Sequence, residues 1–135
     1  MDGDYDEHSV SVKIALYSHD LDSVLLMKYS RGIYGLPGGH LDANEMPDEA
    51  LVRELMEELS VQLTSFEKAS FFMRSGRGSS VILGYTGIAT EAFVMDPTHP
   101  EKEVGVWATR QELESLEPIS DEYKEFIFGH WPASR

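Results

Sequence analysis

Residues 39–61, GHLDANEMPDEALVRELMEELSV, combine a glycine turn, a helical pattern and a dense group of carboxylates. The signals that start a helix lie in the middle of this stretch. Pro47 suits the first helical position, because its missing N–H would have no intrahelical partner there. Asp48 and Glu49 suit the positive end of the helix dipole. No helix-breaking residue follows before Leu59, so we predict a helix over residues 47–59.

The predicted helix has two chemically different sides. At 3.6 residues per turn, one side carries the apolar residues Leu51, Val52, Leu55, Met56 and Leu59. The other side carries Arg53 and the glutamates Glu54, Glu57 and Glu58, which are i, i+3 and i+4 neighbours. Like charges so placed destabilise an isolated helix, and Mg²⁺, which binds carboxylates together with waters and phosphates, would reverse that effect. The alternative interpretation is a solvated acidic face.

A longer spacing pattern distinguishes between these interpretations. Residues 39–61 fit the pattern GX5EX7REUXEEXGU, in which U is aliphatic, at every position except one. The fixed positions that match include Gly39, Glu45, Arg53, Glu54, Glu57 and Glu58. The stretch resembles the signature of the Nudix (MutT-type) hydrolase family, and the preceding Leu-Pro-Gly-Gly resembles the entry to that signature. A motif with so many fixed positions is specific.

The resemblance implies a fold, a reaction and a set of roles. It implies an α/β/α sandwich with a mixed sheet, and an enzyme that uses Mg²⁺, or Mn²⁺ in its place, to hydrolyse a nucleoside diphosphate linked to another group. Glu57 and Glu58 are then metal ligands, and Glu54 is either a third ligand or the base that prepares the water. The carbonyl of Gly38 is another implied ligand, and Arg53 is expected to orient a glutamate. The implied catalytic residues are thus Arg53, Glu54, Glu57 and Glu58.

Ser60 is the one departure, because the signature has a glycine there. A helix end commonly takes a left-handed residue at such a position, and a non-glycine residue in that conformation costs on the order of 1 kcal/mol. The position supplies no ligand. We therefore expect local backbone strain at Ser60 without loss of the chemistry.

Composition limits what the chain can bind. Its 135 residues fit one domain, expected over residues 9–135 after a flexible acidic tail at residues 1–8. With 11 basic and 24 acidic residues, the formal charge is −13, which argues against binding to nucleic acid or to an anionic membrane. The chain has no cysteine for disulfides or thiolate metal sites. Without a signal-peptide or membrane-span pattern, we expect a cytoplasmic location.

Strand patterns surround the predicted helix. Residues 10–17 and 23–29 predict a hairpin, whereas residues 30–39 contain four glycines and a proline, too many for a regular element. Further strands are expected within residues 63–74, 81–90 and 104–108, and short helices after Thr109 and Ser120.

Several residues outside the signature are candidates for the site. Arg74 and Arg77 flank a predicted turn and are candidates for phosphate contact, with exposed hairpin arginines as the alternative. Tyr34 stands where the family often has an aromatic residue, which either contacts substrate or packs. Many members carry an extra glutamate, a metal ligand or base, ahead of an aromatic strand position. Glu103 fits that place best, Glu101 is the alternative, and for both an inert surface carboxylate is the competing interpretation.

The sequence after the signature bears on the choice of substrate. The family's ADP-ribose group tends to carry a proline soon after the signature, and its dinucleoside polyphosphate group a tyrosine slightly later. Here no proline lies between Pro47 and Pro97, and the first tyrosine after the signature is Tyr85, too late for that marker. We therefore expect a nucleoside triphosphate pyrophosphohydrolase acting on a small-molecule nucleoside polyphosphate, as a monomer or homodimer. The alternatives are a pyrophosphatase for nucleotide sugars, ADP-ribose or dinucleoside polyphosphates, a non-catalytic nucleotide-binding or regulatory module, and an acidic interaction domain.

Overall fold

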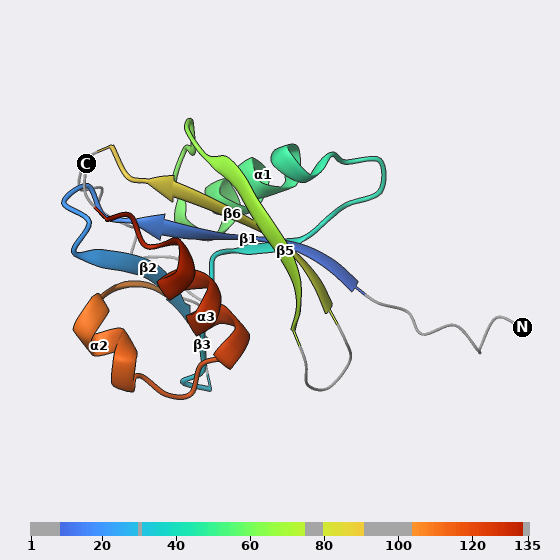
Figure 1. Ribbon diagram of the computed structural model, residues 1–135. Coiled ribbons are helices and arrows are strands. Elements are labelled where there is room, and N and C mark those ends of the chain that lie inside the picture. Colours follow the sequence, from blue (N-terminus) through green and yellow to red (C-terminus); the bar gives the residue numbers. More distant parts are fainter. Residues whose placement is uncertain (1–8, 30, 75–79, 91–103, 134–135) are drawn as a thin grey trace, which may run out of the picture.

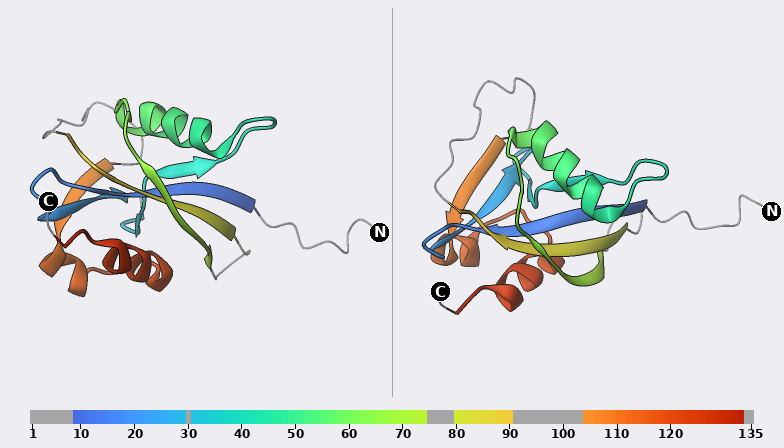
Figure 2. Two further views of the ribbon diagram at one scale, coloured as in Figure 1. Left: turned by 45° about the horizontal axis from the view of Figure 1, so that its top comes forward. Right: turned by 90° about the horizontal axis from the view of Figure 1, so that it is seen from above.

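The computed structural model describes residues 9–29, 31–74, 80–90 and 104–133. In these ranges the chain forms one mixed β-sheet with helices on both faces (Figure 1). Helix α1 (Pro47–Leu59) covers one face, and α2 (Arg110–Ser115) and α3 (Asp121–His130) lie on the other, as the turned views also show (Figure 2). This arrangement confirms the α/β/α sandwich that the sequence predicted. The acidic tail at residues 1–8 lies outside the described residues.

Strand β1 (Ser9–Tyr17) is the centre of the sheet. It runs parallel to β6 (Ser80–Ile88) over its whole length, and β5 (Glu67–Arg74) lies antiparallel to β6 at the sheet edge. On its other side, the first half of β1 pairs with the short strand β4 (Gly38–His40). The residues that enter α1 are therefore hydrogen-bonded to the middle of the sheet.

The remaining strands join the sheet through β2 (Ser23–Lys28), which pairs with the end of β1. This pairing, at Tyr17 and Val24, forms the hairpin that the sequence predicted. Strand β2 is antiparallel to β7 (Val104–Thr109) along its whole length, and at Met27 and Lys28 it also pairs with the two-residue strand β3 (Tyr34–Gly35). Strand β2 pairs with β1 only at the end of β1, and β4 pairs with the first half of β1 on the same side.

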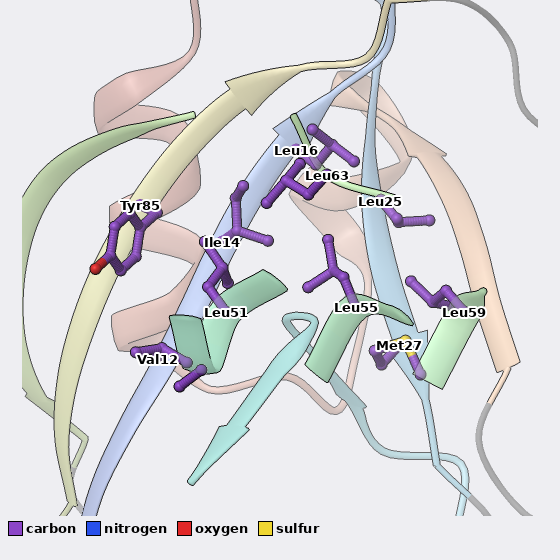
Figure 3. Close-up of a cluster of buried hydrophobic side chains, with 11 residues drawn as sticks. Val12, Ile14, Leu16, Leu25, Met27, Leu51, Leu55, Leu59, Leu63 and Tyr85 are labelled. Atoms are coloured by element: carbon purple, nitrogen blue, oxygen red, sulfur yellow. The ribbon is translucent and has the colours of Figure 1, made fainter. Parts of the chain in front are cut away.

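Alternating residues of the central strands build two cores. The core on the α1 side contains Val12, Ile14, Leu16, Leu25, Met27, Leu51, Leu55 and Leu59 (Figure 3). The core on the α3 side contains Tyr17, Leu26, Ile82, Leu113, Phe126 and Ile127. In β1, the odd-numbered residues from Ser11 to Tyr17 thus face α3, whereas Val12, Ile14 and Leu16 face α1, as expected for a strand buried on both faces.

Two local expectations were wrong. Residues 30–39 include β3 and the first two residues of β4, because pairing with β2 and β1 supplies the stabilisation that this glycine-rich segment lacks locally. Met56 was expected on the apolar side of α1, but it is 45% exposed. The buried seam of α1 follows Leu51, Leu55 and Leu59, and Met56 lies outside this narrow stripe. None of the helices in the described ranges is long and apolar enough to cross a membrane.

Candidate active site

Helix α1 begins and ends where the sequence predicted, and its two ends fix the position of the carboxylates between them. Pro47 is the first helical residue, and the Glu49 side chain accepts a hydrogen bond of 2.9 Å from the Met46 N–H. At the other end, Ser60 adopts φ 57° and ψ 33°, the left-handed conformation expected from the signature. With the leucine seam buried, Arg53, Glu54 and Glu57 are left on the side that faces β4 and solvent.

The Arg53 guanidinium group organises this side of the helix. Its Nε and Nη2 atoms donate to the two carboxylate oxygens of Glu45, at 2.7 and 3.0 Å. Its Nη1 atom donates to Glu54 Oε1 at 3.0 Å and to Glu57 Oε1 at 3.1 Å, and Nη2 also reaches the His40 carbonyl at 3.1 Å. One planar cation therefore holds three carboxylates and the end of β4 in one arrangement.

The charges in this cluster are unequal in number. Hydrogen bonding to Glu45 raises the pKa of Arg53 above its usual value, and the same contact lowers the pKa of the Glu45 carboxyl. Asp42 adds a carboxylate oxygen 3.5 Å from Arg53 Nε. A single guanidinium group thus faces four carboxylates, and the surplus of negative charge favours a cation beside them.

Two glycines let β4 approach the helix and the sheet closely. Gly38 has φ +138°, and a Cβ atom there would overlap the Val12 carbonyl of β1. Its N–H donates to Glu58 Oε1 at 3.0 Å, which brings this carboxylate to the loop. A Cβ atom at Gly39 would overlap the Glu54 carboxyl group. The Gly-Gly pair is therefore required by contact, at Gly38 with the strand and at Gly39 with a candidate catalytic group.

The carboxylates have the chemistry of a Mg²⁺ site, although in this structure they accept hydrogen bonds from Arg53 and from the Gly38 N–H. Glu54, Glu57 and Glu58 offer only hard oxygen atoms, which is the ligand type that Mg²⁺ prefers. Within the described ranges, no three His, Asp or Glu side chains are grouped closely enough to hold a metal ion in this arrangement. The Glu57 side chain is 59% exposed and the Glu54 side chain 17%, so Glu57 is the more accessible of the two from solvent.

A cavity of about 620 Å³ lies on the α3 face of the sheet, on the other side of β4. Its described lining contains no aspartate or glutamate, in a chain that carries 24 of them. The lining includes the basic residues Lys13, Arg31, His40 and Arg74 and the tyrosines Tyr29, Tyr34 and Tyr123. The positive charge and the aromatic side chains of this lining are suited to an anionic ligand that carries a ring.

Strand β4 connects the cavity to the acidic cluster. His40 pairs with Ser11 of β1, and Gly38 pairs with Lys13. His40 and Lys13 line the cavity, whereas Gly38 contacts Glu58 and the His40 carbonyl contacts Arg53. A carboxylate site and a basic cavity are therefore separated by the width of one short strand.

The family model of the NUDIX domain matches residues 7–128, most of the chain. The chain belongs to the NUDIX family. Among curated proteins, an "8-oxo-dGTP diphosphatase" of Proteus vulgaris is 44% identical over 39 residues, 29% of this chain and 35% of that protein. A "MutT-like protein" of Streptomyces ambofaciens is 30% identical over 71 residues, 53% of this chain and 46% of that protein. Each match thus spans less than half of the relative.

Solved structures show the NUDIX fold over a larger part of the chain. The NUDIX domain of Shewanella oneidensis NrtR, in complex with ADP ribose, superposes with a TM-score of 0.78 at 22% identity, covering 95% of this chain and 89% of that one. The MutT NUDIX hydrolase of Burkholderia pseudomallei superposes with a TM-score of 0.74 at 22% identity, covering 90% of this chain and 97% of that one. At these identities the likeness is one of fold, and it confirms the predicted fold. The family predicted from the signature is confirmed by the match to the NUDIX family model.

Of the candidate residues outside the NUDIX signature, two lie in the cavity lining and the others lie outside the described residues. Tyr34 and Arg74, far apart in the sequence, line the same cavity. The Arg74 guanidinium group lies 6.0 Å from the Tyr123 ring centre, and Lys28 Nζ lies 5.8 Å from the ring of Tyr34. Arg77, Glu103 and the alternative Glu101 lie outside the described residues.

Sequence reasoning missed three basic residues of the cavity, Lys13, Arg31 and His40. Lys13 had a usable signal, because strand alternation separates it from Val12 and Ile14 and turns it to the other face of the sheet. Arg31 and His40 gave no such signal. Their place in the cavity depends on how β2, β3 and β4 pair.

Proposed function

We propose that this NUDIX protein is a Mg²⁺-dependent hydrolase, with Mn²⁺ as a substitute, that cleaves the diphosphate linkage of a nucleoside triphosphate and releases pyrophosphate. The observation that carries the proposal is the placement of an acidic cluster on α1 beside a basic, tyrosine-lined cavity, with β4 between them. Carboxylates with a divalent cation are suited to a diphosphate, and the cavity is suited to the rest of a nucleotide.

The metal would be held by Glu57 and Glu58, by the Gly38 carbonyl and, as a third carboxylate, by Glu54. When bound, Mg²⁺ neutralises phosphate charge and makes a coordinated water more acidic. Phosphoryl transfer depends on positioning and on charge stabilisation more than on covalent help from the protein. The close contacts of Arg53 and Gly39 with the Glu54 carboxylate supply such positioning.

In the proposed reaction a water oxygen forms a bond to one phosphorus of the α–β linkage while the bond from that phosphorus to the bridging oxygen breaks. The bridging oxygen leaves with the other half of the substrate, so the products are nucleoside monophosphate and pyrophosphate. If Glu54 is the base, its carboxylate takes the proton that the water loses, and Glu103 is a further candidate metal ligand. If Glu54 is a third ligand, Glu103 is the candidate base. Arg53 keeps the Glu54 carboxylate oriented through the bond from Nη1. On the cavity side, Arg74 and Tyr34 contact the nucleotide, and Arg77 is a further candidate for a phosphate contact.

A triphosphate is preferred over ADP-ribose and nucleotide sugars on charge. A nucleoside triphosphate carries more negative charge than ADP-ribose or a nucleotide sugar, and Lys13, Arg31 and Arg74 make the cavity basic. The Proteus vulgaris relative is named for a nucleoside triphosphate substrate, which supports the same choice. The ADP ribose bound by the NrtR domain supports the alternative diphosphate class.

The net negative charge bears on the kind of partner. At a formal charge of −13 the protein repels the phosphate backbone of nucleic acids and anionic membrane surfaces, so the proposed partner is a small molecule. We propose a monomer or homodimer in the cytoplasm, over a single domain at residues 9–135.

A substrate screen tests the proposal. Nucleoside triphosphates, nucleotide sugars, ADP-ribose and dinucleoside polyphosphates are incubated with the protein and Mg²⁺, and the products are separated by ion-exchange chromatography. Pyrophosphate with nucleoside monophosphate from a triphosphate supports the proposal. Preferred cleavage of ADP-ribose would replace the triphosphate by the alternative substrate class. Tight nucleotide binding without any cleavage would indicate a regulatory module.

A further inference from the structure

His40 lies at the point where the basic cavity meets the acidic cluster. It is the last residue of β4, its carbonyl accepts the hydrogen bond from Arg53 Nη2 at 3.1 Å, and its side chain lines the cavity. The neighbouring positions of β4, Gly38 and Gly39, contact Glu58 and Glu54. A ligand that reaches from those carboxylates into the cavity therefore passes beside the His40 side chain.

The His40 imidazole ring is held by a buried partner. Its Nδ1 atom lies 3.3 Å from Ser11 Oγ, and Ser11, at 5% exposure, is the one buried polar or charged residue in the described part of the chain. A buried hydroxyl group is costly unless it has a hydrogen-bond partner. With Nδ1 bonded to Ser11, the second ring nitrogen, Nε2, is the atom that remains to contact a ligand.

We propose that His40 is a substrate-binding residue of this NUDIX protein, and that Ser11 positions it. The Ser11 hydroxyl donates to Nδ1 and so fixes the neutral tautomer in which Nε2 carries the proton. Nε2–H then donates a hydrogen bond to a phosphate oxygen of the substrate. The inference rests on the proposed function, because it takes a nucleoside polyphosphate as the ligand of the cavity.

Two substitutions of His40 distinguish the roles of its two ring nitrogens. The amide nitrogen of asparagine is as many bonds from Cα as Nδ1, and that of glutamine as many as Nε2. His40→Asn therefore keeps a group beside Ser11 and removes the donor toward the ligand, whereas His40→Gln keeps the distal donor. His19, exposed in the turn between β1 and β2 and outside the cavity lining, provides the control variant His19→Asn.

The first measurement is binding of α,β-methylene-ATP and α,β-methylene-dGTP with Mg²⁺ by calorimetry, beside KM and kcat for the parent triphosphates. His40→Asn is expected to weaken binding and raise KM by about ten- to hundredfold, the effect of losing a hydrogen bond to a charged oxygen. Because such a contact is made in both the ground state and the transition state, kcat should change by less than about threefold. His40→Gln and His19→Asn should stay near the wild type.

The second measurement tests Ser11 without any ligand. At alkaline pH, the ¹⁵N shifts of the His40 ring in the wild type should show a single tautomer with the proton on Nε2. Ser11→Ala should give a mixture of tautomers and a raised KM, and Ser11→Thr, which keeps the hydroxyl group, should restore both. If Ser11 had a purely structural role, Ser11→Ala would change the stability of the protein but leave the His40 tautomer and KM unaltered.

The outcomes distinguish this inference from the proposed function. If the wild type cleaves triphosphates and His40→Asn binds the analogues as well as the wild type does, the His40 inference is wrong and the proposed function stands. A wild type that neither cleaves triphosphates nor binds the analogues would overturn the proposed function, and the inference with it.

Discussion

Arg53 binds Glu45 through two parallel hydrogen bonds, from Nε to Oε2 at 2.7 Å and from Nη2 to Oε1 at 3.0 Å. The pair joins the loop before α1 to the middle of the helix, and the remaining donor, Nη1, reaches Glu54 and Glu57. A planar guanidinium group can make all these contacts at once, whereas an ammonium group is a point charge. The orientation of the candidate catalytic carboxylates thus depends on a residue that need not touch the substrate.

Arg53→Lys is expected to lower kcat for triphosphate hydrolysis by about ten- to hundredfold, because the charge remains but the geometry of the fork is lost. KM should change little, since Arg53 lies outside the cavity lining. Steady-state kinetics measures both constants. Arg110→Lys, made where the side chain packs on Phe128 and Trp131, is the control. An unaltered kcat in Arg53→Lys would show that the Glu54 carboxylate needs no such support.

The same contact predicts a dependence of stability on pH. Hydrogen bonds from Arg53 lower the pKa of Glu45 in the folded state relative to the unfolded state. Such a group contributes stability that is fully present above the unfolded pKa, about 4.3, and lost as the pH falls through the lower folded value. Urea unfolding at pH 7 and below pH 4 should show a smaller acid-induced loss in Glu45→Gln than in the wild type. Equal losses would mean that Glu45 titrates alike in both states.

The two glycines of β4 should respond differently to alanine. Gly38→Ala places a Cβ atom against the β1 backbone at φ +138°, so we expect the free energy of unfolding to fall by about 3 kcal/mol. Gly39→Ala meets the movable Glu54 carboxyl group, so stability should change less while kcat falls at least about tenfold. Thermal unfolding and kinetics on both variants test the contrast. Equal destabilisation of the two variants would contradict it.

Ser60 tests the departure from the signature. Its φ of 57° is left-handed, where a non-glycine residue is strained by about 1 kcal/mol, partly offset by the greater chain entropy of glycine when unfolded. Ser60→Gly should therefore be neutral or raise the melting temperature by up to about 4 °C. Activity should not change, because Ser60 supplies no ligand. A clear fall in melting temperature would show that the serine side chain stabilises this helix end.

The sequence was sufficient for whatever is encoded locally along α1. Pro47, the leucine seam and the left-handed Ser60 were predictable because helix signals and periodicity act within a few turns. The role of Gly39 in packing against Glu54 was not predictable, since it arises from contact between β4 and α1. Likewise, Tyr34 and Arg74 were separate candidates until β3 and β5 placed them around one cavity.

The absence of acidic residues from the described cavity lining is also a tertiary property. A formal charge of −13 gives no hint that Lys13, Arg31 and Arg74 gather on the α3 face. Met56 shows that helical periodicity can also predict burial where the structure leaves a side chain exposed. A helical wheel places it with the leucines, but the sheet covers only a narrow stripe of the helix.

The central claim is that the α1 carboxylates support metal-dependent hydrolysis of a nucleoside triphosphate. The most direct test is the rate of pyrophosphate release with Mg²⁺ and with excess EDTA, for the wild type, Glu58→Gln and the exposed α3 control Glu125→Gln. We predict that EDTA abolishes release, that Glu58→Gln lowers kcat at least about a hundredfold with its circular dichroism spectrum unaltered, and that Glu125→Gln matches the wild type. Release that persists in EDTA, or is unaltered in Glu58→Gln, would contradict the claim.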